Sequence, residues 1–498
     1  MNAAEHLLGA AALALHGART ALIGGGESVT YAQLAARTAR SAAALGALGV
    51  RPGDRVLLMM RDTPEFAAAW LGAVHAGAVA VGVNSKLSND DVRHIASDSG
   101  AKLALIEDVF VAERSGLAAD VRLVGSDEWR ALERVAPRAE AFDGTPDSPA
   151  LMLYSSGTTG RPKGIVHRHH SILCVGASFR ELGLGEGDCV FTTSKFFFAY
   201  GLEHGLLSPL SRGATSILCA DWPDAEAVID IVSRHRPAAM FSVPTIYRRL
   251  LAEAPGRLAA FTGVRRFVAG GERLSSQLAS QWNKALGAEI LNLYGMSETF
   301  CACIVTPPGT SDGVRTGRPL PGVEVRLLSA DGSEPGAEDP GMLWVRHPAQ
   351  ASGYANLPEQ TLEQFRDGWF CSRDLFVRDA EGYYIHQGRS DELVKVAGQW
   401  VRPGELEETA ARAAGVAEAA CVPVQDADGL ERLALFVTPR GDAAAAQRAA
   451  IEACEQALPR HKRPKWVRAV DELPRTATGK VQRYKLREIL ERELAGKG

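Results

Sequence analysis

Short apolar runs alternate with helical segments along most of the chain, from Ser28 to about Leu375. The run RVLLMM at 55–60 precedes a helix-like segment at 64–77, and the apolar run AVAVGVN follows at 78–84. Strands that alternate with helices in this way predict mixed and parallel sheets covered by helices. The alternation continues in the later runs ATSILCA (214–220), AAMFSV (238–243), VRRFVAG (264–270) and AEILNLYG (288–295).

The pattern changes after Leu320, where strands and turns replace the alternation. The segments GVEVRLLSADG and GMLWVRHP predict a small β-rich subdomain. Past Asp391 a smaller α/β unit follows, about the size of a compact domain. We therefore predict an α/β protein with a large N-terminal domain over 1–390 and a small C-terminal α/β domain over 391–498. The large domain combines mixed and parallel sheets, covering helices and the β-rich subdomain.

The composition is that of an ordinary globular protein, with 498 residues, 46% hydrophobic and 23% charged. The net charge of −4 argues against a nucleic-acid partner. Eight cysteines lie scattered without CxxC spacing, which disfavours disulfides and a zinc site. The apolar N-terminal segment carries Glu5 and no basic region before it, so it predicts a helix and not a signal sequence. Since no run approaches the ~18 apolar residues of a membrane span, we expect a cytoplasmic protein without a membrane partner.

One stretch, YSSGTTGRPKG from Tyr154 to Gly164, packs serines, threonines, glycines and a lysine into a short loop. It follows an apolar run, ALML at 150–153, that predicts a buried strand. Backbone N–H groups, hydroxyl donors and one ammonium in such a loop can surround a polyphosphate. Lys163 follows Pro162, so the loop lacks the G-x-x-x-x-G-K-[ST] pattern of a Walker A motif. The stretch predicts a phosphate-binding loop of another kind.

Five further motifs follow the loop in order. They are AGGE (269–272), NLYGMSE (292–298), WFCSRDL (369–375), GRSDELVK (388–395) and PRTATGK (474–480). With these motifs the chain resembles the AMP-forming acyl-CoA synthetases, the adenylate-forming superfamily that also holds aryl-CoA ligases, peptide-synthetase adenylation domains and luciferases. The resemblance runs from about Thr30 to the C-terminus. It implies ATP, Mg²⁺ and CoA as cofactor and co-substrates.

The resemblance also implies which residues meet the nucleotide. The phosphate loop would hold the β- and γ-phosphates through Ser155, Ser156, Gly157, Thr158, Thr159, Gly160 and Lys163. The adenine side of the site would be formed by Gly270, Gly271, Glu272, Asn292, Tyr294, Gly295 and Met296, and the hydroxyl of Ser297 would meet phosphate. Asp374 would accept the ribose hydroxyls, Arg389 would meet the ribose or the α-phosphate, and Glu298 would bind Mg²⁺. The chain departs from the family pattern at Ser297, where threonine is usual, and at Arg373, where glycine is common.

Lys480, in the last motif, is implied to be the catalytic lysine of adenylation, acting with Glu298 and Thr158. A lysine on a glycine-hinged loop can neutralise charge that develops on a carboxylate and an α-phosphate. The resemblance further implies that the C-terminal domain is mobile and rotates about a hinge at Asp391. Rotation would remove Lys480 and bring the segment from Lys395 to Gly398 over the pantetheine tunnel.

The segment KFFFAYGL, from Lys195 to Leu202, resembles the benzoate-CoA ligase branch of the superfamily. Consecutive phenylalanines are more typical of a core than of a pocket, and this interpretation applies to Phe196 and Phe197. By the resemblance, the acyl site is lined by Phe198, Ala199, Tyr200, Gly295, Phe300, Cys301 and Ala302. Aromatic walls suit a flat ring and leave little depth for a long chain. We predict benzoate, or a substituted or alicyclic ring acid, in preference to fatty acids beyond eight carbons.

Three alternatives share parts of this pattern. A stand-alone adenylation enzyme that loads a carrier protein would use the same first half-reaction, and a short- or medium-chain fatty acyl-CoA synthetase would differ in its acyl site. A non-enzymatic ligand-binding relative would be expected to lose Lys480 or Glu298, and both are present. We therefore predict an ATP-dependent carboxylate–CoA ligase that works through an acyl-AMP. Its partners would be a small carboxylic acid, ATP and CoA, and formation of a homodimer is left open.

Overall fold

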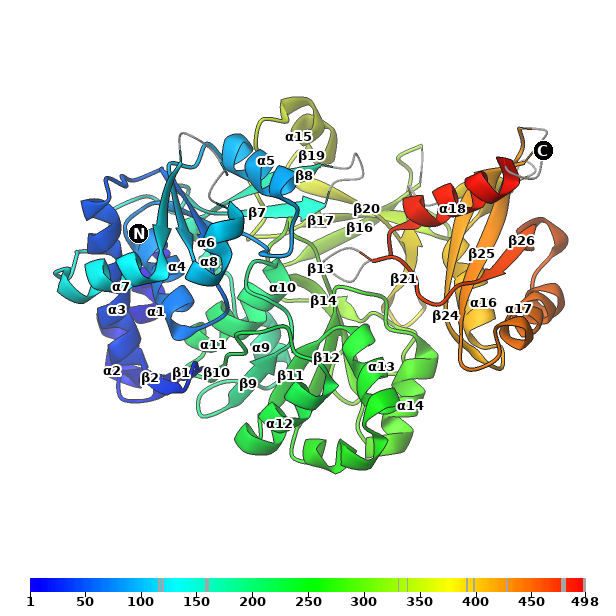
Figure 1. Cartoon of the computed structure of the whole chain (residues 1–498), viewed down its shortest axis with the longest axis horizontal. Helices are drawn as coiled ribbons and strands as arrows, with labels where there is room; N and C mark the ends of the chain where they lie inside the picture. The colour runs from blue at the N-terminus through cyan, green and yellow to red at the C-terminus, as the bar shows by residue number, and fades with distance from the viewer. Residues whose placement is uncertain are drawn as a thin grey trace.

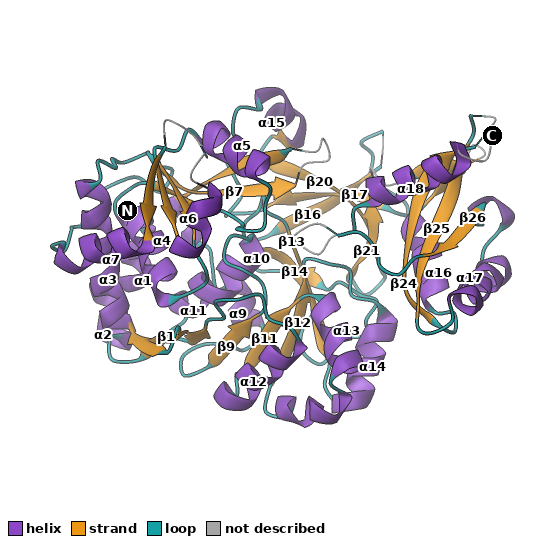
Figure 2. Ribbon diagram, viewed as in Figure 1, coloured by secondary structure: helices purple, strands orange, loops and turns teal. Residues whose placement is uncertain are grey.

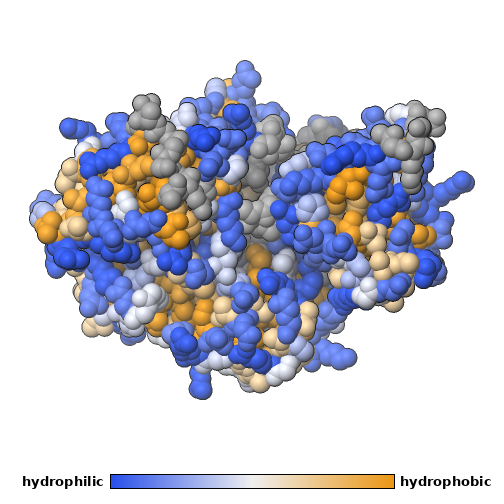
Figure 3. Space-filling view, in the orientation of Figure 1, coloured by the Kyte–Doolittle hydropathy of each residue, from blue (hydrophilic) through white to orange (hydrophobic). Residues whose placement is uncertain are grey.

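The computed structural model shows an α/β protein whose helices are arranged around several sheets (Figure 1 and Figure 2). The described residues are 1–114, 117, 121–156, 161–329, 331–337, 339–390, 393–396, 399–426, 429–475 and 481–495. In Figure 1 the C-terminal segment, coloured orange to red, forms a smaller lobe beside the main body. Figure 3 shows that hydrophilic residues dominate the face in view, with apolar residues in scattered groups.

A first large sheet carries the hairpin that flanks the phosphate loop. Within the described residues its strands lie in the order β18-β8-β7-β4-β3-β5-β6. Their bounds are β3 Arg55–Met59, β4 Val79–Gly82, β5 Leu103–Ile106, β6 Arg122–Gly125, β7 Pro149–Ser156, β8 Pro162–Arg168 and β18 Gly353–Tyr354. Strands β3 to β7 pair in parallel, whereas β7 and β8 are antiparallel. Every residue of β4 and β5 is buried, as expected for parallel strands covered on both faces.

The N-terminal helices begin at residues that satisfy their free N–H groups. Thr30 and Gln33 form a capping box at α3, Thr63 caps α4 directly before Pro64, and Ser88 caps α5. Helix α4 is buried along nearly its whole length and packs in the largest hydrophobic cluster. The helices of this region are α1 Ala3–Leu8, α2 Ala10–His16, α3 Tyr31–Ala47, α4 Pro64–His75, α5 Asn89–Ser99, α6 Asp108–Arg114 and α7 Ser126–Val135.

A second large sheet supports the adenine and acyl motifs. Its strands lie in the order β15-β14-β13-β12-β11-β9-β10-β1-β2. Their bounds are β1 Thr20–Gly24, β2 Glu27–Thr30, β9 Cys189–Thr192, β10 Thr215–Ile217, β11 Ala239–Ser242, β12 Arg266–Gly270, β13 Ile290–Gly295, β14 Ala302–Val305 and β15 Arg318–Pro319. The helices that accompany it are α12 Ala225–His235, α13 Pro244–Glu253, η2 Pro255–Phe261 and α14 Ser276–Leu286. They pack through an aromatic cluster, in which the Trp282 ring lies 4.9 Å from that of Tyr247 and 5.1 Å from that of Phe267.

Short helical segments link β8 of the first sheet to β9 of the second, and then β9 to β10 within the second sheet. They are α8 His169–Leu173, α9 Ala177–Glu181, α10 Ala199–Leu202, the π-helical turn η1 Glu203–Leu207 and α11 Ser208–Ser211. Helix α10 runs directly into η1 and then into α11. All five residues of η1 are buried, so this connection passes through the interior of the protein.

The β-rich subdomain predicted after Leu320 is present. One sheet has the order β16-β17-β20-β19, and β21 pairs with β20. The bounds are β16 Glu324–Leu328, β17 Gly341–Arg346, β19 Phe365–Arg366, β20 Trp369–Arg378 and β21 Tyr384–Arg389, with helix α15 at Pro358–Gln364. The antiparallel pairing of β20 with β21 sets Asp374 opposite Arg389. The spacing of these two motif residues along the sequence therefore corresponds to one β-hairpin.

The C-terminal segment has hydrophobic clusters of its own. Its three-stranded sheet has the order β24-β25-β26, and a separate hairpin pairs β22 with β23. The elements are β22 Val394–Val396, β23 Gln399–Val401, α16 Pro403–Ala411, β24 Val416–Gln425, β25 Glu431–Pro439, α17 Ala443–Ala457, η4 Arg460–Lys462, β26 Trp466–Ala469 and α18 Arg483–Ala495. The predicted α/β class, with a β-rich subdomain and a small C-terminal α/β unit, is confirmed.

Candidate active site

The hairpin of β7 and β8 frames the predicted phosphate loop. Its register places Ser155 opposite Lys163, and Tyr154 on the same strand donates a hydrogen bond of 2.8 Å to Asp98 Oδ2 on α5. The loop residues Gly157, Thr158, Thr159 and Gly160, and the side chain of Ser156, lie outside the described residues. Their roles toward phosphate stay predictions, while the strand pairing fixes both ends of the loop.

A carboxylate and a tyrosine meet beside this hairpin. Tyr354 Oη lies 2.8 Å from Glu298 Oε1 and 2.9 Å from Gln364 Oε1. The Lys163 ammonium lies 5.9 Å from the centre of the Tyr354 ring. Burial, reinforced by the nearby charge of Arg373, lowers the pKa of Lys163, and Glu298 opposes this shift. Lys163 from the phosphate hairpin and Glu298 from the loop after β13 therefore share one polar region.

Asp374 is held by three groups that converge on its carboxylate. Tyr294 donates a 2.7 Å hydrogen bond to Oδ2, and His386 Nε2 lies 3.2 Å from Oδ1. Arg389 Nη1 lies 4.0 Å from the same Oδ1. Burial alone would raise the pKa of Asp374, but the contacts with His386, Tyr294 and Arg389 outweigh it and lower that pKa. An ionised, oriented carboxylate of this kind can accept hydrogen bonds from a diol.

Arg373, which stands where the family commonly has glycine, keeps a glycine-like backbone. Its φ of 60° lies in the left-handed region that non-glycine residues rarely adopt. Two contacts hold this conformation: the guanidinium bonds Glu363 on α15 at 2.7 Å, and the backbone carbonyl accepts a 2.9 Å hydrogen bond from Ser390. Arg373 therefore adopts, within β20 and directly before Asp374, the left-handed conformation that glycine favours.

The predicted adenine residues lie at the adjacent ends of β12 and β13. The parallel register sets Ala269 beside Asn292 and Gly270 beside Leu293. A Cβ on Gly270 would lie 2.8 Å from Tyr200 Cε2, so glycine at this position makes room for the tyrosine ring. Tyr294 and Gly295 complete β13. Gly271 and Glu272 follow β12, and Met296 and Ser297 follow β13. Glu272 is anchored on α13 by the Thr245 hydroxyl at 2.7 Å.

The two segments predicted to line the acyl site approach the same strand ends. Phe198, Ala199 and Tyr200 are partly exposed, whereas Phe300, Cys301 and Ala302 are buried. Gly295 pairs with Ala302 across β13 and β14. Phe300 has a φ of 59° and packs its ring 5.4 Å from that of His167 on β8. The structure thus brings the adenine, acyl and phosphate segments together.

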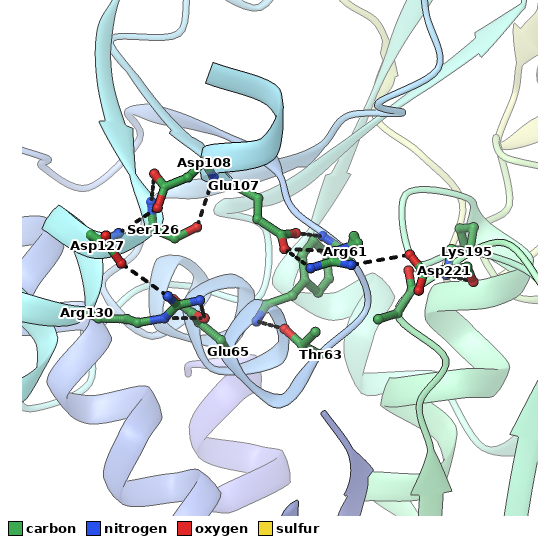
Figure 4. A network of polar contacts seen from close by, with 12 residues as sticks. Arg61, Thr63, Glu65, Glu107, Asp108, Ser126, Asp127, Arg130, Lys195 and Asp221 are labelled. Atoms are coloured by element: carbon green, nitrogen blue, oxygen red, sulfur yellow. Dashed lines mark hydrogen bonds and ion pairs between the residues drawn. The ribbon is translucent and has the colours of Figure 1, made fainter. Parts of the chain in front are cut away.

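A polar network anchors the start of the acyl segment. The buried Lys195 ammonium lies 3.2 Å from Asp62 Oδ2 and donates to the carbonyls of Cys219, Ala220 and Asp221. Asp62 also accepts from the Phe196 N–H at 3.3 Å. Burial raises the pKa of Asp62 to about 6 against the opposing charge of Lys195. Figure 4 shows Lys195 beside Asp221, which Arg61 joins to Glu107. Phe196 is buried, in agreement with the core interpretation, whereas Phe197 is only partly buried and packs against Phe198 and Trp222, so the interpretation is wrong for Phe197.

The C-terminal unit contacts the main body through ion pairs. Glu418 on β24 bonds Arg248 of α13 at 3.1 Å and Arg475 of its own unit at 2.7 Å. Arg273 pairs with Glu408 of α16. An isolated β-bridge joins Arg475 to Val481. The predicted catalytic Lys480, hinge residue Asp391 and tunnel residue Gly398 lie outside the described residues, and Lys395 is an exposed residue of β22.

Sequence reasoning missed three residues of this region. Tyr354 and His386 orient Glu298 and Asp374, and Glu203, a buried acid of η1, accepts the Ala302 N–H at 3.1 Å. His386 could have been found from the sequence, because it lies on β21, and β21 pairs with the strand β20 that carries Asp374. Tyr354 and Glu203 reach their partners from distant parts of the chain and lie in none of the recognised motifs.

Comparison with known proteins gives the family. The sequence matches the family described as AMP-binding enzyme over residues 10–355, and the AMP-binding enzyme C-terminal domain over 405–480. The chain belongs to the AMP-binding enzyme family. The predicted membership in the adenylate-forming superfamily is confirmed, and the similar proteins below agree with its benzoate and aryl-CoA ligase branch.

Similar proteins cover essentially the whole chain. The 3-hydroxybenzoate–CoA/4-hydroxybenzoate–CoA ligase of Thauera aromatica is 41% identical over 99% of this chain and 98% of its own. The 3-hydroxybenzoate–CoA ligase of Aromatoleum sp. (strain CIB) is 39% identical over 98% of this chain and 97% of its own. Among solved structures, a benzoate CoA ligase from Burkholderia xenovorans LB400 has a TM-score of 0.91 at 33% identity, covering 98% of this chain and 100% of its own. The anthranilate CoA ligase AuaEII in complex with anthranoyl-AMP has a TM-score of 0.92 at 30% identity, covering 99% and 98%.

Proposed function

We propose that the protein is an ATP-dependent ligase that joins an aromatic carboxylic acid to CoA through an acyl-AMP. The observation that carries this proposal is the 41% identity to a hydroxybenzoate–CoA ligase along 99% of the chain. The arrangement of the site supports it. Lys163 and Glu298 share one polar region, and Tyr294, His386 and Arg389 keep Asp374 ionised.

In the proposed first half-reaction, a carboxylate oxygen of the acid attacks the α-phosphorus of ATP and pyrophosphate leaves. In the second, the sulfur of CoA attacks the acyl carbon, the thiol proton is lost, and AMP leaves with the electron pair of the C–O bond. The two anions of the first step repel each other in water. The protein would act chiefly by alignment and charge neutralisation, with Lys163 at the phosphates and Lys480 between the carboxylate and the α-phosphate.

Mg²⁺ fits this site as a partner of the nucleotide. Glu298 offers carboxylate oxygen, the ligand type that Mg²⁺ prefers, and Tyr354 orients one of its two oxygens. Among the residues that the structure describes, no group of three or more His, Cys, Asp or Glu side chains gathers as a complete metal site. The substrate phosphates would therefore complete the coordination, and the bound ion would offset their charge.

We further propose a domain boundary at Asp391, with residues 1–390 and 391–498 as the two units. Lys480 and the segment from Lys395 to Gly398 both belong to the smaller unit. Rotation about Asp391 would move Lys480 away from the acyl-AMP and bring the segment from Lys395 to Gly398 to it. The ion pairs of Glu418 and Glu408 with the main body are side-chain contacts that such a rotation can break without disrupting a core.

The proposal places the reaction in the cytoplasm, where disulfides are rare. All eight cysteines are free thiols. No helix in the described part of the chain combines the length and apolar character that a bilayer crossing requires.

A screen of acids tests the function. Benzoate, 3-hydroxybenzoate, 4-hydroxybenzoate, octanoate and dodecanoate are each incubated with Mg·ATP, with and without CoA. Pyrophosphate release and thioester mass are then measured. We expect thioester formation with at least one aromatic acid, at a kcat/KM above that for dodecanoate. A higher kcat/KM for dodecanoate would overturn the aromatic assignment, and acyl-AMP formation without any thioester would indicate a carrier protein as acceptor.

A further inference from the structure

Glu203 is a buried carboxyl group inside the acyl segment. It follows Ala199 and Tyr200 by one helical turn, at the start of η1, and its side chain is only 3% exposed. Burial raises the pKa of Glu203 to about 8, against the opposing hydrogen bonds from Ala302 and Cys301. At neutral pH this group is therefore mainly an uncharged acid, which can both donate and accept a hydrogen bond.

The Glu203 carboxyl joins the two segments that are predicted to line the acyl site. Its Oε2 accepts the Ala302 N–H at 3.1 Å, and its carboxyl group also contacts the Cys301 thiol. In the described part of the chain, this carboxyl group therefore receives one backbone N–H and one weakly donating thiol. Because Glu203 follows Ala199 by one helical turn, this carboxyl group lies where the two segments meet.

The neighbouring groups do not turn Glu203 into a structural ion pair. His204 Nδ1 lies 3.5 Å from Oε2 but 3.0 Å from the Tyr200 carbonyl, and its Nε2 is within 3.2 Å of the Ser178 hydroxyl. Burial lowers the pKa of His204 to about 4, so this histidine is neutral. A buried carboxyl group without a cationic partner is costly unless its hydrogen-bonding capacity is used. Packing alone does not account for an acid at this position.

The other predicted walls of the acyl site offer little polar recognition. Phe198, Ala199, Phe300 and Ala302 have apolar side chains. The Tyr200 hydroxyl already lies 3.3 Å from the Ser242 carbonyl and 3.2 Å from that of Val268, so its proton is engaged by the protein backbone. Among the residues around the predicted acyl site, a polar ring substituent could therefore bond to the Glu203 carboxyl or to the weakly polar Cys301 thiol beside it.

We infer that Glu203 is the residue that selects a hydroxyl group on the ring of the aromatic acid. This inference rests on the proposed function and deepens it. The uncharged carboxyl would pair with a ring hydroxyl, each group donating to the other. An unsubstituted ring would leave the Glu203 carboxyl without that partner. Sites built to bond a substrate hydroxyl discriminate strongly against analogues that lack the hydroxyl.

The test compares kcat/KM for 3-hydroxybenzoate, 4-hydroxybenzoate and benzoate in the wild-type protein and in Glu203→Ala and Glu203→Gln. We expect the wild type to favour one of the hydroxybenzoates. Glu203→Ala should lower kcat/KM for that acid about 10- to 100-fold, mainly through KM, and change the value for benzoate by less than about threefold. Glu203→Gln keeps a donor and an acceptor and should retain part of the preference. The matched control is Glu226→Gln, an exposed residue of α12 that pairs with Arg257.

The outcomes separate the inference from the function on which it rests. If wild type and variants use all three acids in the same ratio, Glu203 does not select the hydroxyl, although the aromatic ligase assignment stands. If the wild-type protein forms no thioester from any aromatic acid, the proposed function itself is wrong. If Glu203→Ala does not fold, the ratio measured for Glu203→Gln decides, because an unchanged hydroxybenzoate-to-benzoate ratio in that variant overturns the inference.

Discussion

The acyl region and the contact with the C-terminal unit are built by opposite means. Around Glu203 the side chains are buried and bond mostly to backbone groups, and the Glu203 and His204 side chains are 3% and 0% exposed. At the C-terminal contact the links are between charged side chains, and Arg248, Glu418 and Arg475 are each 27–35% exposed. The acyl region is therefore held in a fixed shape, whereas the C-terminal contact is held by ion pairs that water can replace.

This difference predicts how each region responds to change. Buried groups bonded to backbone are preorganised, so substitutions there should alter which acid is used. Partly exposed ion pairs contribute only about 0–1 kcal/mol each, so substitutions at the contact should alter the balance between the two half-reactions. The predictions below test this division, beginning with the largest expected effect.

Lys480→Ala should reduce acyl-AMP formation by about 10²–10³-fold or more, comparable to the loss of a key charge-stabilising donor. Conversion of synthetic acyl-AMP and CoA to thioester should remain. Pyrophosphate release and thioester formation are measured separately, and the preference among acids should not change. Near-wild-type pyrophosphate release by the variant would remove Lys480 from its assigned role.

Asp374→Ala should raise the KM for ATP about 10- to 100-fold, since a hydrogen bond to a charged group contributes about 1.5–3 kcal/mol. The ratio of kcat/KM values between two aromatic acids should stay the same. His386→Ala serves as a graded comparison, because His386 orients Asp374 and helps to lower its pKa. A change in acid preference, with the KM for ATP unaltered, would show that Asp374 does not serve the nucleotide.

Asp391→Pro fixes φ at the proposed hinge. Thioester formation from acyl-AMP should then fall about tenfold more than adenylation, because the protein would be held in the adenylate-forming arrangement. Single-turnover assays of each half-reaction give the two rates. Equal loss in both steps would argue against a hinge at this residue.

Arg248→Ala removes one ion pair between the main body and Glu418. We expect a change of about two- to fivefold in the ratio of the two half-reaction rates, consistent with a partly exposed pair. Arg249→Ala is the matched control, because Arg249 lies next to it and pairs with Glu253 within the same helix. If both variants shift the ratio equally, the link to Glu418 is not responsible.

The pH dependence of stability gives the smallest expected effect. Glu203 has a pKa raised by burial to about 8, from an ordinary value of 4.5, and faces Cys301, His204 and Tyr200. Because the folded state holds this proton more tightly, its stabilising contribution is full below pH 4.5 and is lost as the pH rises through 8. Between pH 5 and pH 8.5 the Tm of the wild type should therefore fall by about 1–3 °C more than the Tm of Glu203→Gln. An unchanged difference would contradict the buried, uncharged acid.

The parts of this molecule that could be predicted from its sequence are those that repeat or lie close together along the chain. Alternating apolar runs predicted the sheets. The WFCSRDL motif and the first two residues of GRSDELVK lie on the paired strands β20 and β21, which set Asp374 opposite Arg389. Tyr354 and Glu203 were missed because their partners, Glu298 and Ala302, lie 56 and 99 residues away. Glu203 is an acid in an apolar segment, and only tertiary packing reveals that it is buried.

The double pairing of Glu418 has a consequence for the energy of domain separation. Arg475 belongs to the same unit as Glu418, so this pair would move with the unit and keep the carboxylate neutralised after Arg248 is left behind. At this contact the Arg248 guanidinium, already one-third exposed, would need new solvation. Dissolved ions weaken the attraction between partly exposed charges, and their screening (Debye) length is about 10 Å at 0.1 M salt and shorter at higher salt. Raising the ionic strength would therefore weaken the contact between the C-terminal unit and the main body, with little effect on the buried acyl region.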